Sequence, residues 1–319
     1  MKNIAVIGLG NIANRHRRNI RLLFPQAKIY AVPSSGRQVA ETVSDCDEVV
    51  SNIAYVIDQL DMAIVASPAP FHASHALSFI EAGIPVLIEK PVTASLDDGM
   101  QLLGAYQKNK TPVAVGYCLR YMPSAQALWQ ELNNGIIGKL LNADIAVGQY
   151  LPDWRVKNYK NCVSAQKKLG GGALLELSHE LDYTRWLLGE LHVQYAVIRN
   201  SGTLEIDVED LVDVMAVAKK NTVVNIHLDF LQRKAYRKCS FIGTNGRLEW
   251  DLIANCLVLH DASGTKTIYE DQDYDRNLLY MDMLMDFVKL IAGENNNCIL
   301  LEDAVATVKL IEQINNIAN

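Results

Sequence analysis

Three groups of residues have types and spacings that suit redox chemistry on a bound dinucleotide. Gly8, Gly10 and Ala13 form a Gly-x-Gly-x-x-Ala turn between an apolar run and a helix-forming stretch. Lys90 ends the run PVLIEK. His179 lies in the segment ALLELSHELDY, which directly follows three consecutive glycines. A glycine turn of this kind is typical of phosphate binding, and lysine and histidine side chains can hold or move a proton at a reacting oxygen.

The glycine turn predicts a pyrophosphate site. Glycine permits the tight turn and the close approach of backbone to phosphate, and Ala13 keeps the helix close to the sheet. The N–H groups and the positive dipole end of the helix attract the anion. We expect the dinucleotide to contact the turn residues Gly8, Gly10, Asn11, Ile12 and Ala13. The motif also occurs in turns without a ligand, so its place at the start of an α/β region supports the interpretation.

The second apolar run, in IYAVPSSGRQ, indicates which dinucleotide is bound. A site specific for NAD usually has an acidic residue at the end of this strand to bind the ribose hydroxyls. Here Ser34, Ser35 and Arg37 stand there instead. Hydroxyl groups and a guanidinium suit a 2′-phosphate, so the sequence favours NADP(H) over NAD(H). The alternative is that a serine caps the next helix and Arg37 is an exposed residue in its first turn.

Lys90 is expected at the carboxyl end of a parallel strand, where such sheets bind ligands. Pro91 follows it, and the sequence leaves the isomer of the Lys90–Pro91 bond open. Ser95 and Asp98 predict the start of the next helix. A single lysine in this place is more often an ordinary surface residue, so Lys90 needs support from the rest of the chain.

The segment after the three glycines predicts a helix over residues 172–188. At about 100° per residue its apolar positions form one stripe, while Glu176, His179, Asp182 and Tyr183 lie on the opposite face. That face would be solvated in an ordinary helix, but glycines before it permit close approach of a ligand, so it could also line a cleft.

The predicted helices and strands that must position these residues follow one pattern in the first part of the chain and another in the second. Up to about residue 118, apolar runs alternate with helical segments, which predicts a Rossmann-type doubly wound parallel sheet; the runs are 3–9, 28–32, 62–67, 85–89 and 112–117. Beyond it, closely spaced strands joined by turn signals predict a second α/β domain, 119–319, with a mostly antiparallel sheet. Its expected strands are 140–150, 192–200, 211–218, 223–230, 236–242, 247–252, 256–260 and 266–270, and its expected helices are 123–133, 172–188, 274–292 and 302–317.

Composition narrows the class of protein. The chain has 319 residues, half of them hydrophobic, and a formal net charge of −6. An excess of acidic residues argues against a nucleic-acid or anionic-membrane partner, and no apolar stretch is long enough to span a bilayer. The six cysteines are scattered without a Cys-x-x-Cys pair, so we expect free thiols and a cytoplasmic protein.

Four segments together resemble the Gfo/Idh/MocA family of sugar oxidoreductases. They are GLGNIANRH, ASPAPFHASHALSFIEAGIPVLIEKP, VGYCLRYMPSAQAL and GGGALLELSHELDYTRWLLG, and the match extends to NLLYMDMLMDFVKLIAGE near the end of the chain. The resemblance implies a Rossmann domain followed by an α/β domain on a large, mostly antiparallel open sheet, in which the C-terminal helix can pack back on the first domain.

The resemblance also implies roles for individual residues. Lys90 corresponds to the lysine beside the nicotinamide and the reacting oxygen, His179 to the catalytic histidine and Asp182 to the acid three residues later. The family usually has an aspartate four residues before the histidine; here Leu175 stands there, and Glu176 is the nearest acid. Further matches are Ser67, Pro68, His72 and Glu89 at the cofactor, and Arg120 and Tyr121 in the segment that joins the domains.

The chemistry implied is hydride transfer between the nicotinamide and a sugar carbon. We expect His179 to act as acid or base, because histidine titrates near neutral pH, and Lys90 to orient and stabilise the reacting oxygen. Lys90 as the immediate proton carrier is the alternative.

A long loop before the three glycines is the expected place of sugar recognition. It carries Trp154, Arg155 and Tyr159, which could stack on a sugar or meet a carboxylate or phosphate; Tyr183 completes the expected substrate set. Each of these residues could equally be packing or solvated. The pattern LPDW…GGG…ELSHELDY resembles a branch that makes bacterial surface sugars, which suggests a nucleotide-linked or acidic sugar.

Other readings remain open. The chain could reduce a free aldose, inositol or dihydrodiol, or could be a regulator that binds a dinucleotide without turnover. His72 and His75 have a metal-like spacing, but no acid or cysteine stands near, so we expect no metal. The alternating strands of the second half leave one sheet face uncovered, and family members commonly pair there, so we expect a homodimer or homotetramer.

Overall fold

The computed structural model describes residues 1–39, 42–154 and 158–318. The chain forms two compact units, one of Met1–Tyr117 with Asn277–Val308 and the other of Cys118–Arg276 with Lys309–Asn319. The chain first passes from one unit to the other after Tyr117, close to the residue where the predicted pattern of helices and strands changes. The chain then returns to the first unit, in which Val115 donates a backbone hydrogen bond to Ile299.

The first unit contains a parallel sheet in the order β3-β2-β1-β4-β5-β6. Its strands are β1 (Asn3–Ile7), β2 (Lys28–Val32), β3 (Glu48–Val49), β4 (Met62–Val65), β5 (Val86–Ile88) and β6 (Val113–Val115). The apolar residues of β1, β4 and β5 are buried, as the unbroken runs predict. The short edge strand β3 is exposed and gives no such signal.

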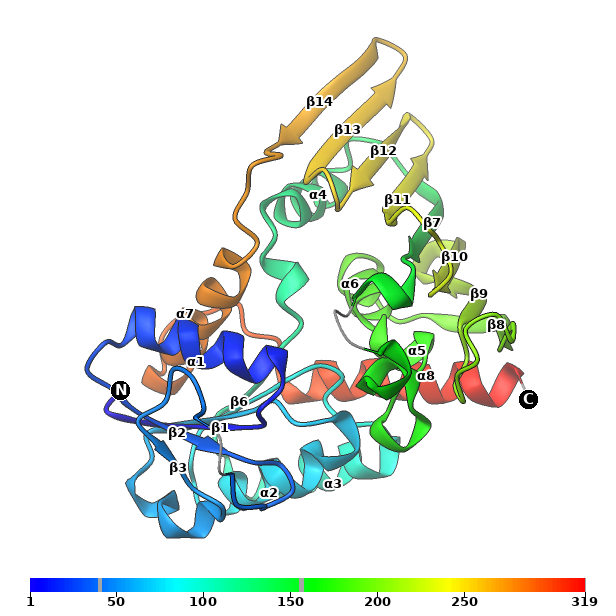
Figure 1. Ribbon diagram of the computed structural model, residues 1–319. Helices are drawn as coiled ribbons and strands as arrows, with labels where there is room; N and C mark the ends of the chain where they lie inside the picture. Colours follow the sequence, from blue (N-terminus) through cyan, green and yellow to red (C-terminus); the bar gives the residue numbers. More distant parts are fainter. Residues whose placement is uncertain (40–41, 155–157, 319) are drawn as a thin grey trace. The chain divides into compact units, whose positions relative to one another are not determined.

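Helices cover both faces of this sheet. Figure 1 shows α1 (Asn11–Leu23) and α7 (Leu278–Ala292) on one face, and α2 (His72–Glu81) and α3 (Leu96–Asn109) on the other. The predicted cap of α3 is confirmed, because the Ser95 hydroxyl accepts a hydrogen bond of 3.2 Å from the Asp98 N–H. The doubly wound parallel architecture is therefore confirmed.

The second unit contains an eight-stranded sheet in the order β14-β13-β12-β11-β7-β10-β9-β8. Only β7 and β10 pair in parallel; the other neighbours are antiparallel. The strands are β7 (Leu140–Gly148), β8 (His192–Arg199), β9 (Leu211–Ala218), β10 (Thr222–Asp229), β11 (Tyr236–Gly243), β12 (Gly246–Asp251), β13 (Cys256–Asp261) and β14 (Gly264–Glu270). This confirms the predicted open, mostly antiparallel sheet.

One face of this sheet packs against helices. Figure 1 shows α4 (Pro123–Asn134), α5 (Ala173–Glu176) and α6 (His179–Leu188) on the same side, and α8 (Leu301–Ala318) ends the chain. On β10, Val224, Ile226 and Leu228 are buried on that side, whereas Val223 and Asn225 are exposed on the other. Within the described ranges, no helix is long and apolar enough to cross a membrane.

The predicted single helix over 172–188 is wrong in one respect. The structure has two helices, α5 and α6, separated by Leu177 and Ser178. Ser178 donates its N–H to Leu175 and Glu180 donates to Leu177, so the backbone tightens from α-helical to 3₁₀ spacing here. The break makes His179 the first residue of α6 and Glu176 the last residue of α5.

Candidate active site

The glycine turn has the backbone geometry that close approach to a phosphate requires. Gly8 adopts φ +117, and a Cβ on it would collide with the carbonyl of Ala66, so only glycine fits. Gly10 is the extended residue before α1, and among the described residues no atom other than those of its chain neighbours lies within 4 Å of the place where its Cβ would stand. Ala13 is fully buried against the sheet. The turn therefore fits a dinucleotide pyrophosphate, with room left above Gly10.

Two cavities of the first unit adjoin this turn. One of about 290 Å³ is lined by Gly10, Asn11, Arg17 and Arg37, and its described lining contains no acidic residue. The other, of about 160 Å³, is lined by Val32, Ser34, His75 and Phe79, a mostly apolar set suited to a flat base. Ser35, between the two lining residues Ser34 and Gly36, is exposed.

His72 connects the ends of strands β4 and β5. Its Nε2 lies 2.6 Å from the carbonyl oxygen of Ser67, and its Nδ1 lies 2.9 Å from the carbonyl oxygen of Pro91. Burial lowers the pKa of His72, and the two carbonyl bonds act against this shift. Because these bonds occupy both nitrogens, His72 has none left for a metal, and no metal-binding cluster is found in the described part of the chain.

Ser67 and Pro68 continue from β4 toward α2. The Ser67 hydroxyl lies 3.0 Å from Nδ1 of His75, which lines the smaller cavity. His72 thus fixes the backbone of Ser67 relative to that of Pro91, which follows Lys90. His75, by contrast, lines the smaller cavity.

Glu89 and Lys90 follow β5 directly, and the Lys90–Pro91 bond is cis. Glu89 is buried, and its carboxylate accepts a 2.6 Å bond from His16 of α1. Burial by itself raises the pKa of Glu89, but the bond from His16 and the charge of Lys90 hold it below its ordinary value. A Cβ on Gly116 would press against the same carboxylate, so Glu89 is enclosed by α1 and by the segment that follows β6.

His179 is half-buried at the start of α6, and Glu176 is half-buried at the end of α5. Glu209 holds the segment in front of them: its side chain accepts from the Leu174 N–H and its carbonyl from the Ala173 N–H, both at 3.0 Å. Burial raises the pKa of Glu209. The start of α5 is therefore capped by a carboxylate from outside the helix.

Arg120 and Asp182 are brought together by the structure. The guanidinium donates to both carboxylate oxygens of Asp182, at 2.9 and 2.6 Å, and both side chains are buried. A buried bidentate pair of this kind fixes the direction of both side chains. Of the polar face of α6, which the sequence left as solvated or lining a cleft, the Asp182 position is covered by Arg120.

The remaining predicted substrate residues have different surroundings. Tyr183 is fully buried on Trp250, with its hydroxyl 3.3 Å from both Glu180 and Cys239, so it belongs to the interior of its unit. Tyr159 donates its hydroxyl to the Leu204 carbonyl at 2.9 Å. Tyr121 is half-buried at the end of a 3₁₀ turn, Cys118–Tyr121. Arg155 lies outside the described residues.

Trp154 packs edge-on against Phe230, with ring centroids 5.4 Å apart. Its indole Nε1 is buried and has no hydrogen-bond partner in the described residues. A buried donor without an acceptor is rare, so this indole is a natural partner for a ligand oxygen.

Sequence reasoning did not identify His16 and Glu209 as site residues. His16 lies one helical turn beyond Ala13, on the face of α1 that meets the sheet, and this spacing was a usable signal. Glu209 is far from the helix that it caps, and nothing local in the sequence marks it.

Comparison with known proteins places the chain in a family. Residues 2–117 match the model described as the Gfo/Idh/MocA oxidoreductase family, NAD-binding Rossmann fold, and residues 125–249 match the Gfo/Idh/MocA C-terminal domain. The chain belongs to the Gfo/Idh/MocA family of NAD-binding oxidoreductases.

Individual relatives agree with this assignment. Inositol 2-dehydrogenase of Acidothermus cellulolyticus is 27% identical over 253 residues, covering 76% of this chain and 71% of that protein. An uncharacterized oxidoreductase of Synechocystis sp. is 31% identical over 166 residues, covering 51% of this chain and 42% of that protein. The solved structure of levoglucosan dehydrogenase in complex with NADH has the same fold, with a TM-score of 0.86 over 99% of this chain and 96% of that chain, at 20% identity.

Proposed function

We propose that this protein catalyses reversible hydride transfer between a nicotinamide dinucleotide and a CH–OH group of a sugar or cyclic polyol. The observation that carries the proposal is that a member of this oxidoreductase family has a phosphate cradle open above Gly10 together with Lys90 directly after β5 and His179 at the start of α6.

The proposed roles follow from the chemistry of the side chains. The bound nicotinamide supplies the group that accepts or donates hydride. His179 takes the hydroxyl proton during oxidation and returns it during reduction, and Lys90 donates a hydrogen bond to the reacting oxygen. Asp182, held by Arg120, keeps α6 oriented, and Glu176 is the acid closest to His179 before the break. Lys90 and His179 belong to different units, so the proposal requires both to reach one substrate carbon during the reaction.

We propose NADP(H) as the preferred cofactor. Arg17 and Arg37 line the larger cavity beside the glycine turn, whose described lining has no carboxylate to repel a 2′-phosphate. Structures of relatives have been solved in complex with NADH or NAD, so this preference rests on the cavity of this chain.

The substrate class divides into two candidates. The LPDW…GGG…ELSHELDY pattern and the indole of Trp154 support a sugar of bacterial surface biosynthesis, nucleotide-linked or acidic, recognised by the loop that also carries Tyr159 and Arg155. A cyclic polyol is supported by the names of relatives, several of which are inositol 2-dehydrogenases. The proposal also includes a cytoplasmic homo-oligomer, dimer or tetramer, paired through the face of the large sheet that carries Val223 and Asn225.

Titration with NADPH and NADH followed by a substrate panel tests the proposal. Keto-sugars, nucleotide-linked sugars and inositols are offered to the wild type, to Lys90→Ala and to His179→Asn, with the exposed Lys108→Ala as control. We expect tighter NADPH binding, turnover with one class, and a loss of about 100-fold or more in the two site variants only. Tight NADPH binding without turnover on any substrate would instead indicate a dinucleotide-binding regulator.

A further inference from the structure

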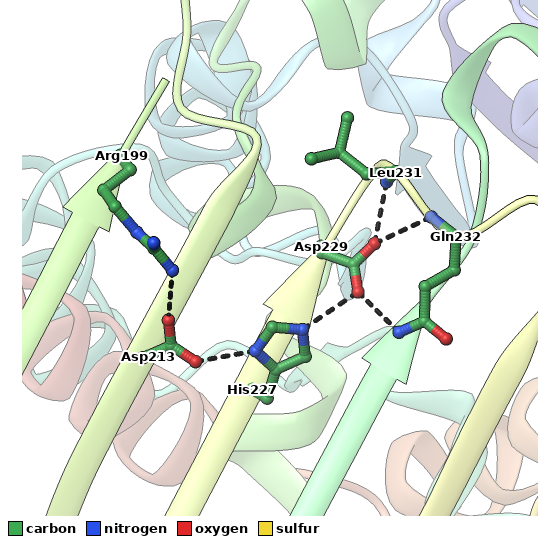
Figure 2. Close-up of polar contacts among 6 residues, drawn as sticks. All are labelled: Arg199, Asp213, His227, Asp229, Leu231 and Gln232. Atoms are coloured by element: carbon green, nitrogen blue, oxygen red, sulfur yellow. Dashed lines mark hydrogen bonds and ion pairs between the residues drawn. The ribbon is translucent and has the colours of Figure 1, made fainter. Parts of the chain in front are cut away.

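A histidine on the large sheet is held between two carboxylates. Figure 2 shows His227 of β10 bonded through Nδ1 to Asp213 at 2.6 Å and through Nε2 to Asp229 at 3.0 Å. Asp213 stands directly opposite His227 in the β9–β10 register, and Arg199 of β8 binds its other oxygen at 2.6 Å. Because both partners accept, both ring nitrogens must donate, and His227 is an imidazolium.

Asp229 has a second set of partners in the turn after β10. Its carboxylate accepts the N–H of Leu231 at 2.7 Å, the N–H of Gln232 at 3.0 Å and the side-chain amide of Gln232 at 2.6 Å. Asp229 is 2% exposed, so these bonds form in an environment with little water. A buried carboxylate with four donors fixes the conformation of residues 229–232.

That turn supports the start of the long loop. The carbonyl of Phe230 accepts the N–H of Leu151 at 3.0 Å, and the carbonyl of Asp229 accepts the N–H of Gln149 at 3.3 Å. The ring of Phe230, fully buried, is the surface against which Trp154 packs. The guanidinium of Arg233 lies 3.7 Å from the ring centroid of Tyr150.

The residue opposite Asp229 shows how closely this network is packed. Gly148 of β7 pairs with Asp229, and a Cβ on Gly148 would collide with the Asp229 carboxylate and the Gln232 amide. The carboxylate therefore occupies the space that a side chain would take. A change in its charge or position must be transmitted to the turn or to β7, because no free volume absorbs it.

We propose that Asp229, held in place by His227, is a positioning residue for sugar binding. It fixes the turn that supports residues 149–154 and the indole of Trp154. The proposal rests on the proposed function, because that function makes this loop the sugar-binding loop. Asp229 does not touch the sugar; it acts through Phe230 and the backbone of Leu151.

The test compares Asp229→Asn, Asp229→Ala and His227→Gln with a matched control, Asp251→Asn. Asp251 also ends a strand of this sheet and accepts two backbone N–H groups, from Ile253 and Ala254 at 2.9 Å each, and both of these bonds lie within its own turn. The first readout is hydrogen–deuterium exchange of the peptide that contains Leu151, which needs no substrate. The second is the separation of sugar KM from kcat and from the dissociation constant of NADPH.

We expect exchange at Leu151 to accelerate about tenfold in Asp229→Asn, the factor for one lost charge-assisted hydrogen bond, and more in Asp229→Ala. Sugar KM should rise by a similar factor, while NADPH binding stays as in the wild type and Asp251→Asn leaves the exchange of the Leu151 peptide unchanged. If the Asp229 variants do not fold, the same two readouts of the milder His227→Gln variant decide the outcome. Unchanged exchange at Leu151 in the folded variants overturns the proposal, as does a KM equal to that of the wild type. If no substrate turns over, the proposed function fails, while the exchange readout still decides whether Asp229 fixes the loop.

Discussion

Glu89 and Lys90 are adjacent in the chain, yet their surroundings differ. Glu89 is buried and bonded to His16, whereas Lys90 is partly exposed beyond the end of β5. The carboxylate thus anchors the strand end from which the lysine projects, and its own role is to bind α1 to β5. Since both are in one sequence motif, the motif alone could not separate the buried anchoring residue from the lysine for which we propose a role at the reacting oxygen.

Substitution of Glu89 tests this anchoring role. Glu89→Gln removes the charge that His16 meets and should lower the free energy of unfolding by about 1–3 kcal/mol. Glu48→Gln, which breaks the exposed Lys28–Glu48 pair at 2.8 Å, should lower it much less, because solvent screens that pair. Urea denaturation at pH 7 measures both values. Equal small losses would show that the buried bond does not stabilise the unit.

Replacement of Gly8 tests whether its positive φ and its close contact with Ala66 are needed for stability and for NADPH binding. Gly8→Ala forces a side chain into a positive φ and against the Ala66 carbonyl, so we expect a loss of more than about 1 kcal/mol and weaker NADPH binding. Gly104 lies inside α3 with open space around it, and Gly104→Ala should stabilise by about 0.5–1 kcal/mol. Chemical denaturation and fluorescence titration of NADPH measure both effects. A Gly8→Ala protein with wild-type stability and binding would contradict the assignment of the turn.

At the scale of elements, the pair β9–β10 carries a charge arrangement that responds to pH. The bond to Asp229, followed by the bond and charge of Asp213, raises the pKa of His227 to about 9. Burial raises the pKa of Asp229, but the bonds from His227, Gln232 and Leu231 lower it overall. Arg199 on β8 is a further charged group near His227. On β7, Ala146 is opposite His227 and Asp144 is opposite Asn225, and Lys238 of β11 is paired with Asp251 at 2.8 Å.

The sign of the pH effect follows from the raised pKa. The stabilisation by imidazolium is complete below the ordinary histidine pKa of about 6.5 and is lost as pH rises through about 9. We expect the wild type to lose about 1 kcal/mol between pH 7 and pH 10 relative to His227→Gln, a figure reduced for the partial exposure of the ring. Denaturation midpoints of both proteins at pH 6, 8 and 10 provide the comparison. Parallel curves would show that His227 contributes nothing to this dependence.

The elements also show where sequence reasoning reached its limit. Periodicity predicted nearly every strand of both sheets, because each carries a run of apolar or alternating residues. It did not predict the break at Leu177 and Ser178, since both residue types are compatible with a helix. The buried partners of Asp182 and Tyr183 were equally hidden, because Arg120 and Cys239 are far away in the sequence.

At the scale of the whole molecule, the cofactor turn lies in the unit of Met1–Tyr117 with Asn277–Val308. A ligand that binds only the folded state stabilises it by about 2.7 kcal/mol at 100 times its dissociation constant. Saturating NADPH should therefore raise Tm by about 5 °C, and the shift should be smaller with NADH. Differential scanning fluorimetry measures these shifts, with Gly8→Ala as the variant expected to lose them. A larger shift with NADH would reverse the proposed cofactor preference.

One of the points at which the chain passes between the two units can be predicted from the sequence, and the reason is physical. The change from alternating helices and strands to closely spaced strands marks the first crossing near residue 118, because parallel and antiparallel sheets need different connections. The return of Asn277–Val308 to the first unit depends on which surface α7 covers, and an amphipathic helix does not specify its partner. The roles of Lys90 and His179 came from resemblance, since neither residue alone differs in sequence from a surface lysine or a packed histidine.

The central claim is that this chain transfers hydride to or from a sugar-like carbon with Lys90 and His179 at the reacting oxygen. The most direct measurement is single-turnover reaction of NADPH deuterated at the nicotinamide C4 with the active keto-substrate, followed by mass spectrometry of the alcohol product. We predict one deuterium on the new CH–OH carbon with the wild type and at least a 100-fold slower transfer with Lys90→Ala and with His179→Asn. An alcohol formed without deuterium from either face of the ring, or transfer that is equally fast in both variants, would contradict the account.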